Sequence, residues 1–224
     1  MSIYLIRHGE TPGNRDRIVQ IPETPLSDRG LDQAGRLARR LGGHPIRHIL
    51  ASDQARAAMT AQVLSGSLGL EVESEPLLQE RNFGDLRGTP YAELKEDLFG
   101  EGFAPPGGET WEEFHERVDR AWEKIERLAL GLDGHLAVVT HGLVLHSLAA
   151  RHLLLPEGAD QGGESSLPRS IGNTALTIAE IAEIAEIAEQ APGEEAPAWR
   201  VVLLACTEHL GSASPGAEEG ITGI

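Results

Sequence analysis

The pentapeptide Arg7-His8-Gly9-Glu10-Thr11 directly follows the apolar run Ile3-Tyr4-Leu5-Ile6. We interpret this run as a short buried strand that carries a cationic and a nucleophilic side chain at its carboxyl end. Gly9 would let the backbone turn tightly and bring an N–H group close to a ligand. A strand that ends in this way suits a phosphate pocket in which His8 attacks phosphorus.

The composition is that of an ordinary globular protein. The chain has 224 residues, of which 40% are hydrophobic and 24% charged, so one domain with a substantial core is expected. The formal net charge of −16 argues against a general nucleic-acid binder and against docking on an anionic membrane. An acidic protein that binds phosphate must gather its positive charge locally, so the position of each arginine matters.

Cysteine content and hydropathy bear on the cellular setting. Cys206 is the only cysteine, which excludes an intrachain disulfide and gives no sign of a structural zinc site. No apolar run approaches the roughly 20 residues that span a bilayer. No secretory leader is visible before the strand that begins at residue 3. We therefore expect a soluble cytoplasmic protein.

Patterns of strands and helices alternate along the chain. Further strands are expected at 46–51, 70–74 and 136–140, and helices at 28–41, 53–68, 111–130 and 143–155. Ser27 and Thr110 are expected to cap two of the helices. The buried face of the first helix is expected to hold Leu31, Ala34, Leu37, Ala38 and Leu41. The alternation predicts an α/β fold, with a mostly parallel mixed sheet and helices on both faces.

A single domain is expected over residues 1–211, with less regular segments inside it. Residues 84–109 are rich in Gly and Pro and are expected to form a cap over the site, with one short helix around Tyr91–Phe99. Residues 178–189 repeat Ile-Ala-Glu four times, and this period of three fits neither a helix nor a strand well. These residues could form an elongated hairpin, and both a helical tip and a frayed tip of that hairpin stay open. An exposed loop is expected at 158–169 and a disordered tail at 212–224.

Phosphoryl transfer without a metal ion needs a nucleophile, positive donors around the phosphoryl oxygens and an acid for the leaving group. His8 is the candidate nucleophile, and its second ring nitrogen then needs a fixed partner such as a backbone carbonyl. Arg7 and Arg56 are candidate phosphate clamps, because a guanidinium group matches phosphate geometry. Asn14 could add a neutral donor. Taken singly, each of these side chains has a commoner structural explanation.

Two further residues complete the candidate set. His141 follows a buried strand, and an imidazole beside a bound anion would be protonated and would stabilise the transition state. A core histidine is the competing interpretation. The pKa of Glu80 would be raised by the like charge of bound phosphate, which suits a general acid that later serves as a base. With 35 acidic residues in the chain, chemistry alone does not select Glu80.

Together these segments resemble the histidine phosphatase superfamily, which includes the cofactor-dependent phosphoglycerate mutases. The resemblance covers about residues 3–210 and rests on four motifs in the family's order. These are Arg7 to Thr11 with Asn14, Ser52 to Ala61 around Arg56, Leu78 to Gly88 around Glu80, and Val138 to Gly142 around His141. One such motif would be weak evidence for the family, whereas four motifs in order and at compatible spacing are specific evidence.

The resemblance implies a phosphoglycerate mutase-like three-layer sandwich and a phosphohistidine intermediate on His8. It further implies that Arg7, Arg56 and His141 form the phosphate pocket and that Glu80 is the proton donor. Additional residues at positions that contact phosphate or substrate are Asn14, Gln20, Arg81 and Gly142.

The phosphatase branch fits this chain better than the glycolytic mutases, which carry a longer insertion after the Glu-containing motif. Here the chain passes quickly to Pro106-Gly107-Gly108-Glu109 and a helix. Three positions depart from the family pattern: Gly13 and Arg87 stand where aromatic residues are frequent, and Ile21 replaces a glycine. These positions border the substrate, so they affect specificity rather than catalysis.

The leading hypothesis is a metal-independent phosphomonoesterase that acts on small phosphorylated metabolites and needs no cofactor. A phosphoglycerate mutase primed by 2,3-bisphosphoglycerate is the first alternative. A phosphate-sensing or protein-interaction module on the same fold is the second. An exposed isoleucine stripe in the repeat at 178–189 could pair with another subunit, which leaves a homodimer open. Neither the substrate nor the oligomeric state follows from the sequence.

Overall fold

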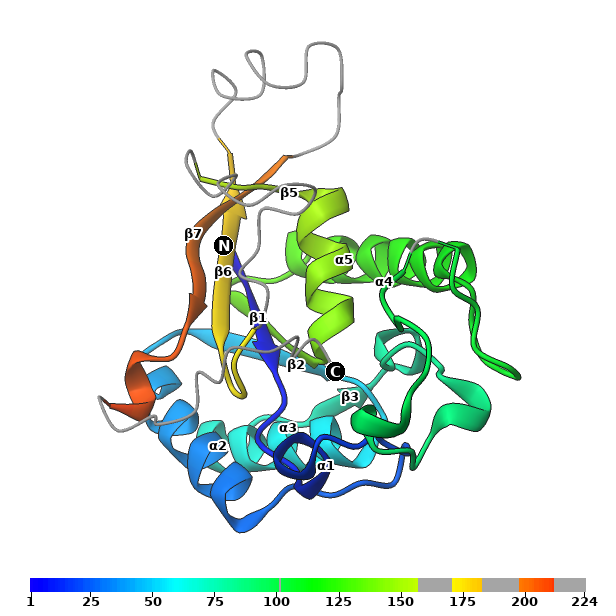
Figure 1. The fold of residues 1–224 in the computed structure, drawn as a ribbon. Coiled ribbons are helices and arrows are strands. Elements are labelled where there is room, and N and C mark those ends of the chain that lie inside the picture. The colour runs from blue at the N-terminus through cyan, green and yellow to red at the C-terminus, as the bar shows by residue number, and fades with distance from the viewer. Residues whose placement is uncertain (101, 157–170, 183–197, 212–224) are drawn as a thin grey trace.

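A mixed sheet with helices on both of its faces forms the centre of the protein (Figure 1). The computed structural model describes residues 1–100, 102–156, 171–182 and 198–211. Within these residues the sheet has seven strands in the order β3-β2-β4-β1-β6-β7-β5. The strands are β1 (Ser2–Arg7), β2 (Ile46–Ala51), β3 (Val72–Ser74), β4 (His135–Thr140), β5 (Leu153–Leu154), β6 (Leu176–Ile181) and β7 (Trp199–Cys206).

The strand pairing is mostly parallel. β1 and β2 both pair with β4 in parallel, β2 pairs with β3 in parallel, and β5 does so with β7. Only β6 runs the other way, antiparallel to β1 and to β7. The predicted α/β fold with a mostly parallel mixed sheet is therefore confirmed.

Two helical layers cover the sheet. The helices are α1 (Pro12–Asp16), α2 (Asp28–Leu41), α3 (Ala55–Leu68), α4 (Trp111–Leu130) and α5 (Gly142–His152). Along β1, Ile3 and Leu5 enter the apolar core shared with α4 and α5, whereas Tyr4 and Ile6 enter the core shared with α2 and α3. Because successive strand residues point to opposite faces, a strand covered on both sides needs an unbroken apolar run.

Helix ends follow the predicted capping residues. The Ser27 hydroxyl accepts a hydrogen bond from the Gly30 N–H at 3.1 Å and starts α2. Thr110 and Glu113 form a reciprocal capping box at the start of α4. Gly69 ends α3 in the left-handed conformation, which glycine adopts without strain.

Three local expectations are wrong. α5 ends at His152 rather than at 155, because the chain there enters β5 and pairs with β7. Leu31 is 40% exposed, so it is not part of the buried face of α2. The helix expected around Tyr91–Phe99 is only a 3-10 turn at Tyr91–Glu93: the N–H groups of Glu93 and Leu94 bond to carbonyls three residues back, and the chain is extended at Leu94.

The first residues of the Ile-Ala-Glu repeat lie in β6. Ile178 is paired with Leu203 and Ile181 with Trp199 of β7, so this part is a strand of an antiparallel pair. The rest of the repeat, the loop expected at 158–169 and the tail expected at 212–224 lie outside the described residues. In the part of the chain that is described, no helix has the length and apolar character needed to cross a bilayer.

Candidate active site

The carboxyl ends of three neighbouring parallel strands meet at one edge of the sheet. Arg7 is the last residue of β1, Ser52 follows β2 and His141 follows β4. Two backbone bonds extend this pairing: His8 N–H to the Thr140 carbonyl and Ser52 N–H to the Val139 carbonyl, both at 3.0 Å. Ligands of open α/β sheets bind at such strand ends.

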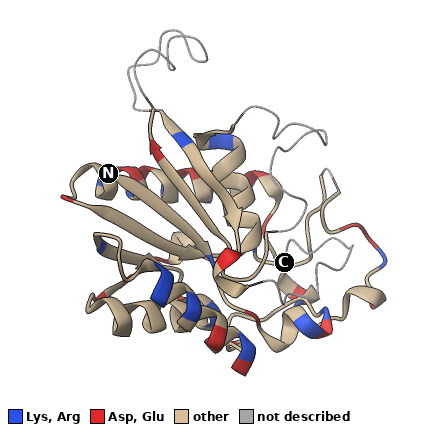
Figure 2. Ribbon diagram, turned by 90° about the vertical axis from the view of Figure 1, so that its left-hand side faces the viewer, with Lys and Arg blue, Asp and Glu red and all other residues tan. Residues whose placement is uncertain are grey.

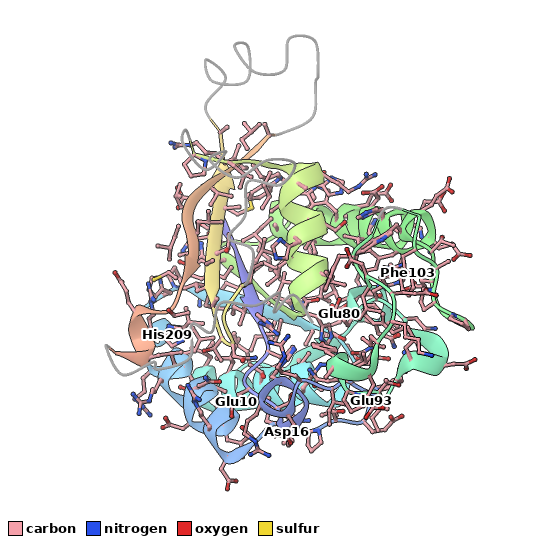
Figure 3. All side chains as sticks on the ribbon, in the orientation of Figure 1. Glu10, Asp16, Glu80, Glu93, Phe103 and His209 are labelled. Carbon is pink, nitrogen blue, oxygen red and sulfur yellow. The ribbon has the colours of Figure 1, made fainter. Side chains whose placement is uncertain are left out.

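The candidate catalytic side chains lie together and are buried. The rings of His8 and His141 have their centroids 5.2 Å apart. Arg7, Arg56 and Glu80 interact electrostatically with one another in the same place. Figure 3 shows Glu80 near the start of α5. All five residues are no more than 5% exposed, so their charges act through little intervening water.

His8 is held in the form that a nucleophile requires. The Nδ1 atom of His8 lies 2.7 Å from the carbonyl oxygen of Gly9. Because a carbonyl only accepts, Nδ1 carries the proton and donates it. The lone pair is then on Nε2. Burial, followed by the charges of Arg56 and Arg7, lowers the pKa of His8 well below its usual value. The imidazole is therefore neutral near pH 7.

The loop after His8 is in direct backbone contact with α2. A Cβ atom on Gly9 would lie 2.6 Å from the Gly30 carbonyl oxygen, and one on Gly30 would lie 2.1 Å from the Glu10 carbonyl oxygen. The Gly9 N–H also donates to the Thr60 hydroxyl at 3.0 Å. Only glycine fits at both positions, and the contact fixes the nucleophile's loop.

Arg56 and His141 present unused hydrogen-bond capacity to the site. Arg56 donates through its terminal nitrogens to the Ile21 carbonyl and to Gln54 Oε1, at 3.2 and 2.6 Å. His141 Nε2 lies 2.9 Å from the Ser52 hydroxyl. Among the described residues, the buried Nε of Arg56 and Nδ1 of His141 have no partner. Buried polar atoms normally have one, so this pair fits a site for an anion.

Burial favours the uncharged form of both histidines. It lowers the pKa of His141 well below its usual value, and the charges of Arg56 and Arg7 lower it further. A bound phosphate dianion would oppose that positive field and favour the imidazolium form. The expected protonation of His141 therefore requires a bound anion.

Glu80 lies beside Arg7 and Arg56, and burial rather than a bound phosphate is the first cause that raises its pKa. Its oxygens accept hydrogen bonds from the N–H groups of Arg81 and Leu143, at 3.0 and 3.3 Å. Burial raises the pKa of Glu80, and these two bonds together with Arg56 and Arg7 oppose the rise. Burial thus favours a protonated carboxyl even before any like charge binds.

Comparison with known proteins settles the family. The profile of the histidine phosphatase superfamily (branch 1) matches residues 3–189. The chain belongs to the histidine phosphatase superfamily. A probable phosphoglycerate mutase, GpmB of Yersinia pestis, is 33% identical over 171 residues, which are 72% of this chain and 79% of that protein.

Solved histidine phosphatase structures share the fold. A mycobacterial glucosyl-3-phosphoglycerate phosphatase in complex with VO3 is 26% identical with a TM-score of 0.71, over 90% of this chain and 97% of its own. YhfR of Bacillus stearothermophilus is 25% identical with a TM-score of 0.73, over 93% and 98% of the two chains. The phosphoglycerate mutase-like three-layer arrangement is thereby confirmed.

The Arg81 side chain contacts the irregular segment after Glu80 and the start of α4. Its guanidinium group stands 3.8 Å from the centre of the Trp111 ring and donates to the carbonyls of Glu109, Leu98 and Phe103. The side chain is 2% exposed. Arg81 therefore ties the irregular segment after Glu80 to the start of α4, and its role at the substrate stays a prediction.

Gln20 and Asn14 line the loop beside the nucleophile. Gln20 Oε1 lies 2.7 Å from the Thr11 hydroxyl, and Asn14 Oδ1 accepts from Asn173 Nδ2 at 3.1 Å. A Cβ atom on Gly13 would lie 2.5 Å from the side chain of Gln20. The small residue at position 13 is thus explained, because Gln20 fills the space that an aromatic side chain would need.

Three contributors were missed from the sequence. Ser52 contacts His141, and its position directly after β2 could have revealed it. Asn173 donates to the His8 carbonyl oxygen at 3.2 Å from a loop distant in sequence. Tyr91 comes from the irregular segment, and its phenol interacts electrostatically with Arg7, Glu80 and Arg56. No local pattern marks Tyr91, because the chain reaches the site there without regular structure.

Proposed function

We propose that this histidine phosphatase hydrolyses small-molecule phosphomonoesters through a phosphohistidine on His8. The observation that supports the proposal most strongly is the neutral His8 with Nδ1 engaged by a carbonyl, beside two buried nitrogen atoms that lack partners. Arg56 Nε donates at any working pH, and His141 Nδ1 donates once a bound anion protonates the ring, so both suit the oxygens of a phosphoryl group. Arg7 and Asn14 would complete the pocket, with Gly142 at the start of α5.

In the first step, His8 Nε2 attacks phosphorus and the bond from phosphorus to the ester oxygen breaks. Glu80 gives its proton to that departing oxygen, so the alcohol leaves neutral. Arg7, Arg56 and His141 stabilise the negative charge on the three equatorial oxygens. These groups supply positive charge without a metal ion.

In the second step, the Glu80 carboxylate takes a proton from water, whose oxygen attacks the phosphohistidine. The bond from phosphorus to Nε2 breaks, which returns His8 to its neutral form and releases phosphate. Glu80 is protonated again and is ready for the next ester. One carboxyl group thus serves as acid and then as base.

Phosphoglycerate mutase activity is the second candidate, because a relative that is 33% identical is named a probable phosphoglycerate mutase. Such an enzyme would return the phosphoryl group to another hydroxyl instead of to water. Phosphatases among the solved structures and the short passage from Glu80 to Glu109 favour hydrolysis here.

The test is phosphate release from a panel of phosphomonoesters, measured with and without 2,3-bisphosphoglycerate. We expect release that needs no bisphosphate, together with an acid-labile phosphoenzyme that His8→Ala abolishes. Fast isomerisation of phosphoglycerate with negligible phosphate release would instead identify a mutase. Unchanged turnover in His8→Ala would exclude both candidates.

A further inference from the structure

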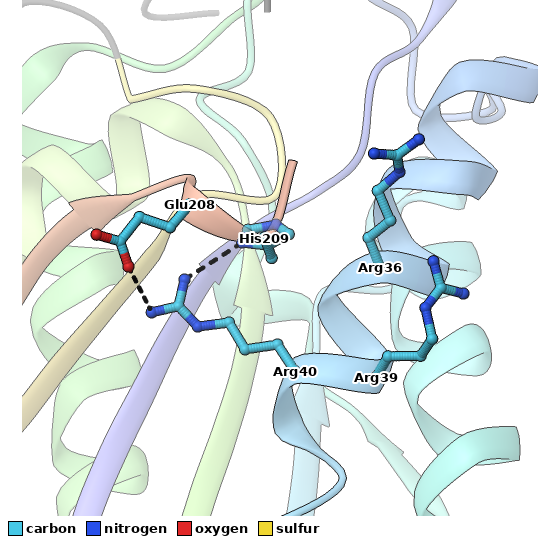
Figure 4. A pocket seen from close by; sticks show the side chains of 5 residues that line it. All are labelled: Arg36, Arg39, Arg40, Glu208 and His209. Carbon is cyan, nitrogen blue, oxygen red and sulfur yellow. Dashed lines mark hydrogen bonds and ion pairs between the residues drawn. The ribbon is translucent and has the colours of Figure 1, made fainter. Parts of the chain in front are cut away.

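A second basic cavity lies at the opposite end of α2 from the nucleophile's loop. It has a volume of about 540 Å³ and is lined by Arg36, Arg39, Arg40, Glu208 and His209 (Figure 4). The three arginines come from α2, and the other two residues come from the 3-10 turn Glu208–Leu210. Gly30, which touches the loop of His8, is about 15 Å away along the helix axis from Arg40.

This cavity concentrates positive charge on a protein whose formal net charge is −16. Arg36, Arg39 and Arg40 are three and four residues apart, so they share one side of the helix. Figure 2 shows basic positions recurring along α2. Arginines in the last turn of a helix are favoured by the helix dipole alone. The dipole does not explain why these three arginines line one cavity together.

Carboxylates near the cavity pair with two of its three arginines. Glu208 is 3.9 Å from Arg40 and its side chain is 85% exposed, so the pair is loose. Asp32 pairs with Arg36 at 2.7 Å. Within the described ranges, no carboxylate pairs with Arg39. An incoming anion would therefore meet no carboxylate at Arg39 and only a loose one at Arg40, and it would compete with Asp32 for Arg36.

Neighbouring contacts orient two of the guanidinium groups. Arg40 Nη1 lies 3.2 Å from Cys206 Sγ and 3.4 Å from His209 Nδ1, and Arg36 Nη1 donates to the Leu210 carbonyl at 3.2 Å. Because arginine only donates, His209 Nδ1 must accept and the proton sits on its Nε2. Burial, followed by Arg40 and Arg36, lowers the pKa of His209 to about 4, so the ring is neutral at pH 7.

From these observations we infer that the cavity is a second anion site that regulates turnover. It would take a small ligand with two phosphate or carboxylate groups, since its three arginines can pair with more than one such group. The volume is in the range of small-molecule sites. This site is separate from the catalytic pocket and uses none of its residues.

The site is connected to the nucleophile by two short routes. His209 Nε2 donates to the Thr174 hydroxyl at 3.0 Å, and Thr174 N–H donates to the His8 carbonyl at 3.2 Å. Thr174 has a φ of 55°, a left-handed conformation that a β-branched residue rarely adopts. The second route is α2 itself, whose Gly30 packs on Gly9. If an anion repositions Arg40, the movement would thus be transmitted through His209 and Thr174 to the backbone of His8.

The experiment titrates methylenebisphosphonate, which is not hydrolysed, into the full chain by calorimetry. The wild type should bind it at two sites. Arg36→Gln/Arg39→Gln should keep the catalytic site and weaken the other about tenfold or more, the loss expected for charge-assisted hydrogen bonds. Arg56→Gln should weaken the catalytic site alone. Both arginines of the double variant are exposed, so the fold should persist.

Arg120→Gln is the matched control, because Arg120 is an exposed arginine of α4 on the other face of the sheet. It should bind as the wild type does. In the activity assay, the bisphosphonate should change the kcat of the wild type and of Arg120→Gln but not that of the double variant.

Two results would overturn the inference. Equal calorimetric binding by the double variant and the wild type would remove the second site. Loss of that binding with no difference in the kcat response would remove the regulatory role. Because calorimetry does not depend on turnover, a failure of the proposed hydrolysis is distinguishable from both.

Discussion

Arg117 donates to both carboxylate oxygens of Glu109, at 2.7 and 2.8 Å. Its remaining terminal nitrogen donates to the carbonyls of Leu77 and Gln79, at 2.7 and 2.8 Å. Glu109 in turn accepts from the Asn82 N–H at 2.8 Å. The ion pair therefore holds the backbone on both sides of Glu80, the proposed proton donor.

Replacing Arg117 should weaken both the fold and the reaction. We expect Arg117→Ala to lower the free energy of unfolding by about 2–4 kcal/mol, because Glu109 stays partly buried without its cation. kcat should fall more than KM rises, since Glu80 loses its support. Urea unfolding and steady-state kinetics measure the two effects. Arg120→Ala on the same helix should leave both quantities unchanged, and normal kcat in Arg117→Ala would contradict the positioning role.

Glu80→Gln should test the proton donor. The amide cannot release a proton, so kcat for an alkyl phosphate should fall about 100-fold or more. The loss should be smaller when phosphoenzyme formation is followed with a p-nitrophenyl ester, because that leaving group needs no proton. Quenched-flow labelling of the phosphoenzyme measures this step. An equal loss for both esters would argue that Glu80 only shapes the pocket.

The pH profile provides a second test of Glu80. The acid must be protonated for the first step, and burial raises its pKa. The rate of that step should therefore fall as the pH rises through the pKa of Glu80, and this limb should be absent in Glu80→Gln. A limb that persists unchanged in the variant would assign the titration to another group.

The candidate residues Arg7, His8 and His141 could be predicted to lie together because they stand at or directly after strand ends. His8 and His141 each follow an apolar run that is buried on both faces, and topology alone brings these runs together. The contact of Arg81 with Trp111 could not be predicted, and the role of Arg81 at the substrate stays a prediction. Contacts of this kind depend on the packing of an irregular segment. Such a segment has no sequence periodicity from which its buried side chains could be predicted.

Ser52→Ala should show that the Ser52 hydroxyl positions His141. Without the contact at 2.9 Å, the imidazole loses the partner of its Nε2. We expect kcat to fall about tenfold, the worth of one buried hydrogen bond, and inhibition by vanadate to weaken in parallel. Ser65→Ala removes a hydroxyl that bonds to the Leu70 carbonyl and serves as the control. Parallel losses in both variants would indicate a general structural effect.

Tyr91→Phe should test a contact that the sequence did not reveal. Burial raises the pKa of the Tyr91 hydroxyl, so it stays protonated and can donate to a phosphoryl oxygen at any working pH. We expect KM to rise about fivefold or more with little change in kcat, and inhibition by phosphate to weaken equally. Tyr4→Phe loses a hydroxyl that contacts His44 and should leave KM unchanged. The idea is refuted if phosphate inhibits Tyr91→Phe as strongly as wild type.

Buried neutral His141 should make the protein acid-sensitive. The unfolded chain takes up a proton near a pKa of about 6.5, whereas burial keeps the folded group neutral to lower pH. Between these two pKa values the unfolded state binds more protons, so stability must fall as the pH falls. His141 should therefore contribute a loss of stability as the pH falls below about 6.5, the pKa of the unfolded chain.

The measurement is urea unfolding of the wild type and of His141→Gln at several pH values between 5 and 7.5. Glutamine does not titrate, so the stability of the variant should decline less steeply than that of the wild type as the pH falls. Other histidines with lowered pKa values, including His146 and His209, contribute equally to both proteins and cancel in the difference. Identical slopes would mean that His141 takes up its proton over the same pH range in the folded and in the unfolded protein, which would contradict a pKa lowered by burial.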